Sequence, residues 1–550
     1  MDFQRLLLSL IFALSLFLLW EGWQRQQHPP LPVPATAVPE SASAPAAAAP
    51  PTPAASATSA SASASVPQGQ EQSGQKITVK TDWLTAEIST AGGDLYHLDF
   101  LRQYDAHDRS KPYTLLDRSD THYYVAQTGL LGNGLPTHNA LFTSPQSEYQ
   151  LTDDQKTLEV RLTAVETGAV KVTKIYTFHR SSYVIDVSYE IENTGTEPLP
   201  ALAYFQLVRD TLQPDSESKF MPTYTGPAVY TEDKKFQKIK FADIEKGKAD
   251  FPHKANNGWI SMLQHYFVAA WFLNDQTERE FYMESLDKGR FRAGMKVPVA
   301  TVAPGKTAKV GVSLYAGPSE SSLNQVAPGL GLTVDYGWLT ILSTPLFWVL
   351  SKLQGWVHNW GIAIILLTVL IKLIFFPLSA ASYRSMAKMR VVAPKLEKIK
   401  QQYGEDRERL HKAMMELYRT EKINPLGGCL PMLIQIPVFI ALYWAILSSV
   451  ELRYAPFFGW IHDLSAPDPF YILPLIMGTS MIIQSRLSPA PPDPMQAKVM
   501  RTMPVVFSIV FFFFPAGLVL YSIVNNVLSI AQQWVITRRL EAGKKGAAKA

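Results

Sequence analysis

The stretch WGIAIILLTVLIKLIFFPLSAASYRSMAKMR, residues 360–390, decides the fold of this chain. From Gly361 to Phe376 its only charged residue is Lys372. A bilayer core about 30 Å thick needs roughly 20 apolar residues of helix, so the stretch predicts a membrane span. Basic residues follow it, as is typical of the cytoplasmic end of a span. We therefore expect a membrane protein whose chain reaches the cytoplasm after residue 378.

The lysine inside this span has two interpretations. A charged residue at the centre of a span costs about 2.5 to 3.5 kcal/mol on insertion scales, so its ammonium needs a partner, water or the headgroups. Lys372 lies about two turns before Ser379, and its stem is long enough to snorkel to the cytoplasmic headgroups. The alternative is that Lys372 faces a functional path. This span alone does not separate the two.

Composition divides the chain into unlike regions. It has 550 residues, and its formal net charge of +4 averages over an apolar amino-terminal segment, a Pro/Ala/Ser tract, a long polar section and an apolar carboxy-terminal third. Its length allows more than one domain. Its one cysteine, Cys429, excludes an intrachain disulfide, so the polar section must be held by its own core.

The amino-terminal residues predict a membrane anchor followed by a tether. Residues 3–20 are leucine-rich, and no small-x-small cleavage site ends the run, so we expect a retained anchor rather than a cleaved signal. Trp20 and Trp23 suit the membrane interface. Residues 28–75 have too few large apolar side chains to bury a core, which is typical of a disordered tether.

The polar section predicts an all-β domain. Alternating runs such as KITVKTDWLTAEIST and YVIDVSYEIENTG are separated by Gly, Asn, Asp and Pro turns, which indicates a sandwich or barrel. Its histidines, among them His97, His179, His253 and His265, lack metal-ligand spacing, and no phosphate-binding loop is present. We expect no metal, cofactor or catalytic residue here, and favour a binding or spacing role.

Loop charges predict the topology of the remainder. The segment 379–428 carries an excess of Lys and Arg and helical apolar spacing, so we expect a cytoplasmic helical hairpin. The loop 451–469 is acidic and suits the opposite side. The carboxy-terminal tail is basic, and one crossing from 494 to 537 would leave it outside, so Pro515–Gly517 should divide that segment into two spans.

The predicted architecture is a polytopic α-helical membrane protein with six transmembrane helices, both termini in the cytoplasm and a large all-β domain outside. The predicted boundaries, in chain order, are: transmembrane anchor 1–27, tether 28–75, β-sandwich domain 76–318, interfacial amphipathic helix 329–359, second transmembrane helix 360–378, cytoplasmic hairpin 379–428, third transmembrane helix 429–450, outer loop 451–469, fourth transmembrane helix 470–486, cytoplasmic loop 487–493, fifth transmembrane helix 494–514, sixth transmembrane helix 518–537 and basic cytoplasmic tail 538–550.

The predicted spans contain no acid that would neutralise Lys372. Glu451 and Asp463 belong to the outer loop, whereas Lys372 lies nearer the cytoplasmic end of its span. An unpaired cation in a membrane needs water. The expected arrangement is a hydrated recess, open to the cytoplasm, whose positive charge attracts acidic groups.

Four segments of the carboxy-terminal third resemble a known family: YRSMAKMRVVAPKLEKIK (383–400), EKINPLGGCLPMLIQIPVFIALYW (421–444), IHDLSAPDPFYILPLIMG (461–478) and FPAGLVLYSIVNN (514–526). They are similar to the YidC/Oxa/Alb membrane insertases, in the Gram-negative form. The resemblance implies that five of the six spans form an insertase core in the bacterial inner membrane. It also implies a periplasmic super-sandwich similar in fold to sugar mutarotases, without their catalysis.

This resemblance also implies a function and partners. Members insert, fold and help assemble nascent integral membrane proteins, as insertase and chaperone, independently or with the Sec translocon (SecYEG and SecDF). The expected partners are these nascent chains, the translocon, the translating ribosome and membrane lipids, with no direct sequence-specific nucleic acid binding. No enzyme activity, catalytic residue, metal or cofactor is implied.

The resemblance assigns site residues as well. The basic residue of the family's groove corresponds to Lys372, where the best-known members have arginine; the charge is kept but the bidentate fork is lost. The groove and substrate-contact positions correspond to Thr368, Gln435, Ile436, Phe439, Tyr521 and Ser522. Ser522 replaces a second aromatic residue at its position.

Two other classes of protein remain as alternatives. A solute transporter predicts repeated halves and broken helices around a midplane site, and neither is clear in the sequence. A membrane-anchored sugar enzyme predicts that all activity resides in the β domain. Deletion of residues 77–317 separates them, because an insertase keeps most of its function and an enzyme loses it.

Overall fold

We describe the protein from a computed structural model, which describes residues 65–67, 74–105, 108–165, 168–214, 223–404, 406–421, 430–487 and 494–547. The predicted anchor 1–27 lies outside the described residues, as do the tether apart from 65–67 and 74–75, the hairpin segment 422–429, most of the loop 487–493 and residues 548–550 of the tail.

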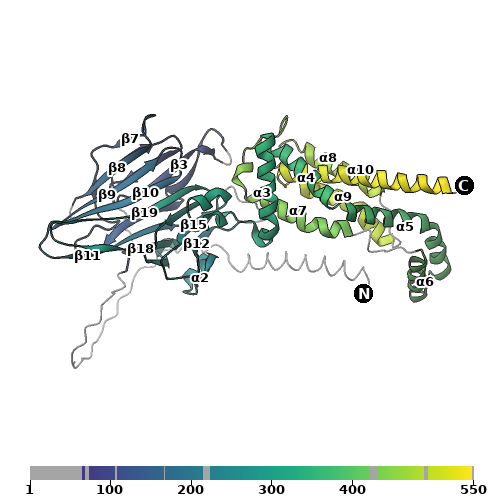
Figure 1. The fold of residues 1–550 in the computed structure, drawn as a ribbon, viewed down its shortest axis with the longest axis horizontal. Helices are drawn as coiled ribbons and strands as arrows, with labels where there is room; N and C mark the ends of the chain where they lie inside the picture. The colour runs from purple at the N-terminus through teal and green to yellow at the C-terminus, as the bar shows by residue number, and fades with distance from the viewer. Residues whose placement is uncertain are drawn as a thin grey trace, which may run out of the picture. The chain divides into compact units, whose positions relative to one another are not determined.

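Strands from Lys76 to Pro318 form two sheets that face each other in a sandwich (Figure 1). The first sheet has ten strands in the order β14 (Lys254–Ala255), β17 (Arg279–Ser285), β18 (Phe291–Val302), β11 (Leu199–Arg209), β5 (Tyr123–Leu131), β4 (Pro112–Arg118), β3 (Leu95–Tyr104), β2 (Leu84–Ser89), β1 (Lys76–Lys80) and β7 (Glu148–Gln150). Its pairs are antiparallel, except that β1 pairs with β7 in parallel.

The second sheet is antiparallel throughout. It has nine strands in the order β13 (Lys235–Lys238), β12 (Gly226–Thr231), β15 (Trp259–Gln264), β16 (Phe267–Phe272), β19 (Thr307–Pro318), β10 (Val184–Asn193), β9 (Val170–His179), β8 (Thr157–Ala164) and β6 (Phe142–Thr143). A short helix, α2 (Phe241–Glu245), and a 3₁₀ turn, η1 (Asp287–Gly289), interrupt the strand sequence.

The sandwich core follows from the alternation in the strands. In β10, Ile185, Val187, Tyr189 and Ile191 are fully buried, whereas residues between them are partly exposed. Successive side chains of a strand point to opposite faces, so this alternation directs one face into the core between the sheets. The prediction of a large all-β sandwich is confirmed.

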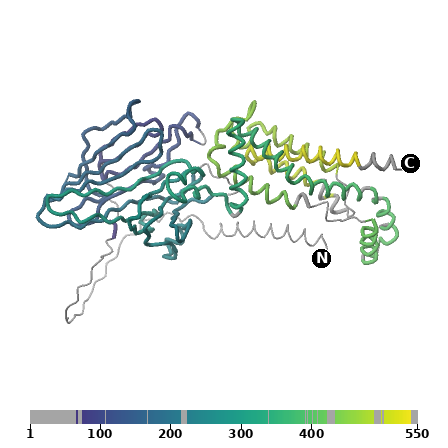
Figure 2. The backbone as a smooth tube through the Cα atoms, in the orientation of Figure 1, coloured from purple at the N-terminus to yellow at the C-terminus, as the bar shows by residue number. Residues whose placement is uncertain are grey.

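Helices make up the rest of the described chain (Figure 2). Three 3₁₀ turns lead into them: η2 (Ser321–Gln325), η3 (Leu330–Thr333) and η4 (Gly337–Leu339). The helices are α3 (Thr340–Val357), α4 (Trp360–Ile374), α5 (Phe376–Tyr403), α6 (Arg407–Thr420), α7 (Leu430–Ser448), α8 (Ile472–Leu487), α9 (Pro494–Phe511) and α10 (Ala516–Ala547), with the turn η6 (Val450–Leu452) after α7. Helix α10 packs against α8, α4 and α5.

The predicted interfacial helix 329–359 is shorter than expected. Its first third forms the turns η3 and η4, because Gly329 and Gly337 adopt positive φ angles of 75° and 64° that a helix does not accommodate. Helix α3 begins only at Thr340. It buries Phe347 and leaves Trp348 and Trp356 largely exposed, as in an amphipathic helix.

Two other predicted boundaries also differ from the helices. The second span was expected to end at residue 378, but α4 ends at Ile374 and α5 begins at Phe376 after a bend of 66°. Pro377 fits there, because the first turn of a helix has no amide hydrogen bond for proline to remove. Helix α10 continues through most of the predicted tail, to Ala547.

Membrane-length helices are fewer than the number of predicted spans. Within the described residues, one helix, Ala516–Arg539, is by itself long and apolar enough to cross a bilayer. The bent pair Trp360–Ile374 and Phe376–Met389 meets the same criterion when taken together. Shorter apolar helices cover Leu433–Ser448, Ile472–Leu487 and Thr502–Phe511. The count of six spans therefore stays a prediction.

Candidate functional site

Lys372 lies in the last turn of α4 and faces the neighbouring helix α10. Its Nζ donates a hydrogen bond of 2.8 Å to Ser529 Oγ, and the lysine is only partly exposed. Among the side chains that the structure describes, no carboxylate lies within 4.0 Å of this ammonium. The charge of Lys372 therefore has a neutral partner and no compensating acid.

Ser529 belongs to a polar row on one face of α10. Tyr521, Asn525 and Ser529 are spaced by four residues, so they lie on the same side of the helix. Ser529 Oγ donates to the carbonyl of Asn525 at 2.7 Å and accepts from Lys372. Asn525 Oδ1 is buried and has no hydrogen-bond partner within the described part of the chain. A buried polar atom of this kind is costly unless water or a ligand reaches it.

Three of the predicted contact residues meet where α7 packs on α10. Gln435 Nε2 donates to Tyr521 Oη, and the ring of Phe439, one turn further along α7, lies 6.4 Å from the Tyr521 ring. Phe511 of α9 closes the cluster, with its ring 6.2 Å from that of Phe439. Tyr521 is 1% exposed. This cluster joins three helices through one buried tyrosine.

The other predicted residues take different positions. Ile436 points outward and is 43% exposed. Thr368 and Ser522 are buried, and their hydroxyls donate to carbonyls of their own helices, at 2.7 Å to Ile364 and 2.9 Å to Leu518. These hydroxyls satisfy local backbone groups. Ser529 follows Tyr521 by eight residues, so Lys372 lies about 12 Å along α10 from the aromatic cluster.

The sequence reasoning missed Ser529 and Phe511. A signal for Ser529 existed, because it falls eight residues after Tyr521 and so on the same helix face. Phe511 stands in a run of four phenylalanines, and nothing in that run distinguishes the one that packs on Phe439.

The β sandwich holds a fully buried lysine in different surroundings. Lys174 is fully buried and donates to the carbonyls of Gly93 at 2.7 Å and Gly92 at 3.2 Å. Asp94 lies beside it and accepts a hydrogen bond of 2.7 Å from Gln127. Burial raises the pKa of Asp94 to about 7 and lowers the pKa of Lys174 to about 8. This charge is compensated, as in a structural core.

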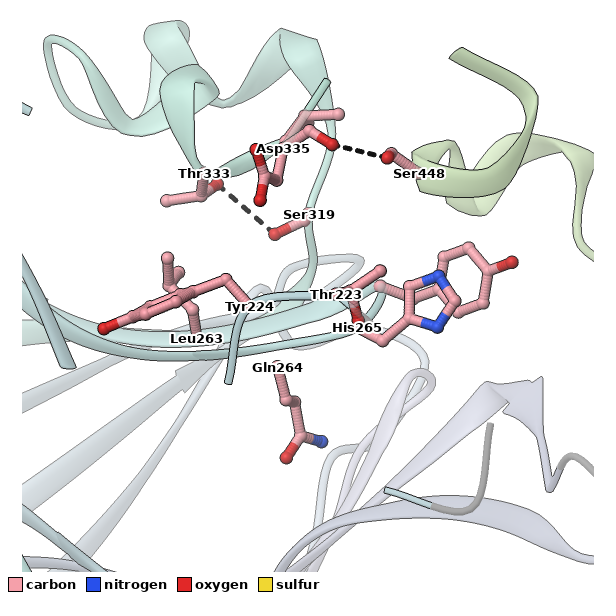
Figure 3. A pocket seen from close by; sticks show the side chains of 11 residues that line it. Thr223, Tyr224, Leu263, Gln264, His265, Ser319, Thr333, Asp335 and Ser448 are labelled. Carbon is pink, nitrogen blue, oxygen red and sulfur yellow. Dashed lines mark hydrogen bonds between the residues drawn. The ribbon is translucent and has the colours of Figure 1, made fainter. Parts of the chain in front are cut away.

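A small cavity lies against the second sheet (Figure 3). Its volume is about 20 Å³, and its lining includes His265, Ser319 and Asp335. Ser319 Oγ donates to the Thr333 hydroxyl at 3.3 Å, and Ser448 Oγ donates to the Asp335 carbonyl at 2.5 Å (Figure 3). This volume holds about one water molecule, so the cavity cannot take a sugar or a peptide.

Metal chemistry has no candidate centre in the described residues. No group of three or more His, Cys, Asp or Glu side chains lies close enough there to hold a metal ion. The fold and the site together define a class: an apolar helical bundle with an internal cation that has no acidic partner among the described side chains, attached to a large β sandwich.

Comparison with known proteins specifies the family. A model of the YidC periplasmic domain matches residues 76–349, and one of the 60Kd inner membrane protein matches residues 352–544. A relative from Nitrosospira multiformis, named Membrane protein insertase YidC, is 53% identical over 100% of this chain and 99% of its own length. The chain belongs to the YidC family. It is accordingly a bacterial inner-membrane protein with a periplasmic β domain.

Two solved structures match this chain with low TM-scores. One is titled "Active YidC insertase crystal structure with the first transmembrane domain resolved"; it is 20% identical, covers 84% of this chain and 92% of its own, and has a TM-score of 0.38. A galactose mutarotase related enzyme from Lactobacillus acidophilus is 11% identical over 44% of this chain and 97% of its own, with a TM-score of 0.30. Family membership rests on the sequence matches alone.

Proposed function

We propose that this chain is a membrane protein insertase and chaperone, which inserts nascent integral membrane proteins into the inner membrane and helps them fold and assemble. Its family membership supports this function, since the relative that matches its whole length is named Membrane protein insertase YidC. The proposed activity is not enzymatic and uses no cofactor. Hydrophobic partitioning of the substrate into lipid provides the driving force.

The observation that carries the proposed mechanism is the uncompensated charge of Lys372. Its described partner is the neutral Ser529 hydroxyl, and the buried Asn525 oxygen beside it has no described partner. Water would stabilise both groups by hydrogen bonding to them, and this supports a hydrated groove open to the cytoplasm and to lipid. The groove attracts the acidic end of a substrate and shortens the apolar path that it crosses. The membrane potential then adds about 2.3 kcal/mol per charge per 100 mV.

An apolar surface on α7 provides the route into lipid. Leu433, Ile436 and Pro437 are exposed, and the latter two follow Leu433 by three and four residues, so each lies beside it on one side of the helix. This surface follows the side of α7 adjacent to the residues that contact Tyr521. A substrate helix sliding along it exchanges protein contacts for lipid contacts with little change in apolar exposure.

The proposed topology has six spans, both termini in the cytoplasm, and the hairpin of α5 and α6 in the cytoplasm as the part that receives substrates. Exposed basic residues support this side for the hairpin. They are Arg384, Lys388, Lys395, Lys398, Arg409, Lys412 and Arg419. The loop 487–493 and the tail then face the translating ribosome, and the chain works alone or with the Sec translocon, SecYEG and SecDF.

Site-specific photocrosslinking tests this path. A photoreactive residue replaces Ile436 or Phe439, and a nascent single-span protein is stalled at increasing lengths in inner-membrane vesicles. We expect crosslinks at lengths where the nascent helix is partly exposed. A probe at Ile341, which is 93% exposed on α3, controls for random contact. Silence at Ile436 and Phe439 while insertion proceeds would place the path elsewhere.

A further inference from the structure

Part of the outer face of the ten-stranded sheet, on β11 and β18, is polar and yet buried. On β17 and β18 the inward side chains Phe281 and Met295 belong to the sandwich core. The alternate residues of these strands, and of the neighbouring β11, point to the opposite face. There Tyr204 is 0%, Gln206 1% and Arg292 4% exposed. Buried polar side chains on the outside of a sandwich require something to cover them.

The cover is a segment of the chain that precedes the first strand. Arg292 donates from its two terminal nitrogens to the carbonyls of Val66 and Pro67, each at 3.0 Å. The Val66 side chain is 4% exposed and packs with Leu131, Tyr204 and Tyr282. We call residues 65–67 the strap. The two arms of the Arg292 guanidinium thus bind two successive backbone carbonyls. The β-branched Val66 side chain packs in the apolar niche formed by Leu131, Tyr204 and Tyr282.

The charges of this face are already paired. Glu284 lies opposite Arg292 in the β17–β18 register and accepts its hydrogen bond at 2.5 Å, and Glu280 accepts from Lys296 at 3.0 Å. An added carboxylate would therefore meet acids as well as bases. The site favours an uncharged segment, which it holds by its backbone.

The floor of the site is built for aromatic rings. A Cβ on Gly294 would lie 2.6 Å from Tyr282 Oη, and a Cβ on Gly129 would lie 2.3 Å from Tyr204 Oη. Only glycine leaves room for the two tyrosines to cover their strands. Tyr282 Oη donates to Gln206 at 3.0 Å, which fixes one ring in place.

His138 adds a polar atom at the edge of this floor. Its backbone amide donates to Tyr204 Oη at 2.9 Å, and its Nδ1 lies 2.5 Å from the same oxygen. Burial, with Lys174 and Arg292 nearby, lowers the pKa of His138 to about 4, so the imidazole is neutral at pH 7. Its Nε2 is buried and has no partner among the described residues.

We propose that this face is a binding site for an extended, uncharged peptide in which a β-branched residue precedes proline, and that the chain's own strap is its resident occupant. The strap attaches the end of the predicted tether to the sheet. It occupies the site in cis, and a second peptide binds only when the strap is released. This proposal is independent of the insertase function, because no residue of the helical bundle contributes to the site.

Peptide binding to the full chain in detergent tests the proposal. The probe is a fluorescently labelled peptide of residues 62–70, ASASVPQGQ. Val66→Asp puts a charge into the apolar niche and releases the strap, so we expect this variant to bind the probe at least tenfold more tightly than the wild type. A probe with aspartate in place of its valine is the matched negative control.

Arginine variants test the recognition itself. Adding Arg292→Gln to Val66→Asp should abolish binding of the probe. Adding Arg292→Lys should also weaken binding at least tenfold, because lysine keeps the ion pair with Glu284 but lacks the two-armed guanidinium. This conservative variant controls for a loss of folding in the glutamine variant. Arg161→Gln, an exposed arginine paired with Glu190, should have no effect. Equal binding by wild type and Val66→Asp, or binding that survives both Arg292 changes, overturns the proposal.

Discussion

Lys174 is fully buried in the β sandwich and Lys372 is partly exposed in the helical bundle, and the partners of their ammonium groups differ. Lys174 in the β sandwich has two backbone carbonyls, the nearby Asp94 and the ring of Tyr176, whose centroid lies 5.3 Å from Nζ. Lys372 in the helical bundle has one neutral hydroxyl on a neighbouring helix. The first lysine satisfies its charge inside the fold. The second keeps its charge available to another molecule.

The comparison shows how a structural charge differs from a functional one. Burial of a charge is tolerated when partners replace the lost hydration, and breaking one such partnership is costly. A charge whose lost hydration is not replaced by protein groups is stabilised when water or an acidic group approaches it. The two residues are the same amino acid, so the sequence position alone does not tell which charge is structural. The difference comes from the neighbours that folding places around each ammonium group.

Lys174→Met should destabilise the β sandwich by about 3 to 5 kcal/mol, because it leaves Asp94 buried without its nearby cation and removes the lysine's hydrogen bonds to the carbonyls of Gly92 and Gly93. Denaturant unfolding of the full chain, followed through proteolysis of the sandwich, measures the loss. The double variant Lys174→Met/Asp94→Leu should recover much of it. If single and double variants are equally unstable, Lys174 acts through packing rather than through charge.

Lys372→Ala should slow insertion of substrates with acidic periplasmic tails by about tenfold, or about 1.4 kcal/mol, while thermal stability stays near that of the wild type. Lys372→Arg keeps the charge and should keep most of the activity. Protease protection of the translocated tail in vesicles gives the rate, and a substrate with a neutral tail is the control. An alanine variant as active as the wild type removes this charge from the mechanism.

Glu451, in the turn after α7, is a half-buried carboxyl whose pKa is raised to about 7 by desolvation and by Glu320. The folded state then binds this proton more tightly than the unfolded chain, so its contribution is complete below about pH 4.5 and is lost as the pH rises to 7. Glu451→Gln should gain about 1 kcal/mol at pH 8 and nothing at pH 4. Thermal unfolding at both pH values checks this, and an equal effect at both rejects the titration.

Ser529→Ala should reduce insertion about two- to threefold, because Lys372 loses the hydrogen bond that orients it but keeps its charge; such bonds between membrane helices average about 0.6 kcal/mol. Ser522→Ala is a matched control on the same helix, since that hydroxyl bonds only its own backbone. A loss as large as that of Lys372→Ala would mean that the serine hydroxyl itself meets the substrate.

The sequence predicted the parts of the fold that depend on local pattern. Alternating apolar residues such as those of β10 place one strand face in a core wherever the strand pairs. The run around Lys372 and the basic residues after it likewise predicted apolar helix and charged hairpin. It did not predict the break at Phe375 or the late start of α3 at Thr340, because both depend on backbone geometry and on packing against other helices.

The candidate site divides in the same way. Resemblance named Gln435, Phe439 and Tyr521, and the fold brings them together. It also named Thr368 and Ser522, whose hydroxyls turn back to their own helices. The type of a side chain sets which hydrogen bonds it can form. Its rotamer and the neighbouring helix decide which of them it does form.

By itself, the sequence determined that this chain has a β sandwich, an apolar helical region and a cation inside that region, because periodicity and hydropathy are properties of consecutive residues. Only the tertiary structure decided that Ser529 bonds Lys372, that Asp94 lies near Lys174, and that Arg292 holds residues 65–67. Those pairs are separated by between 80 and 226 positions in the chain. Such contacts form only when the packing of whole elements brings distant residues together.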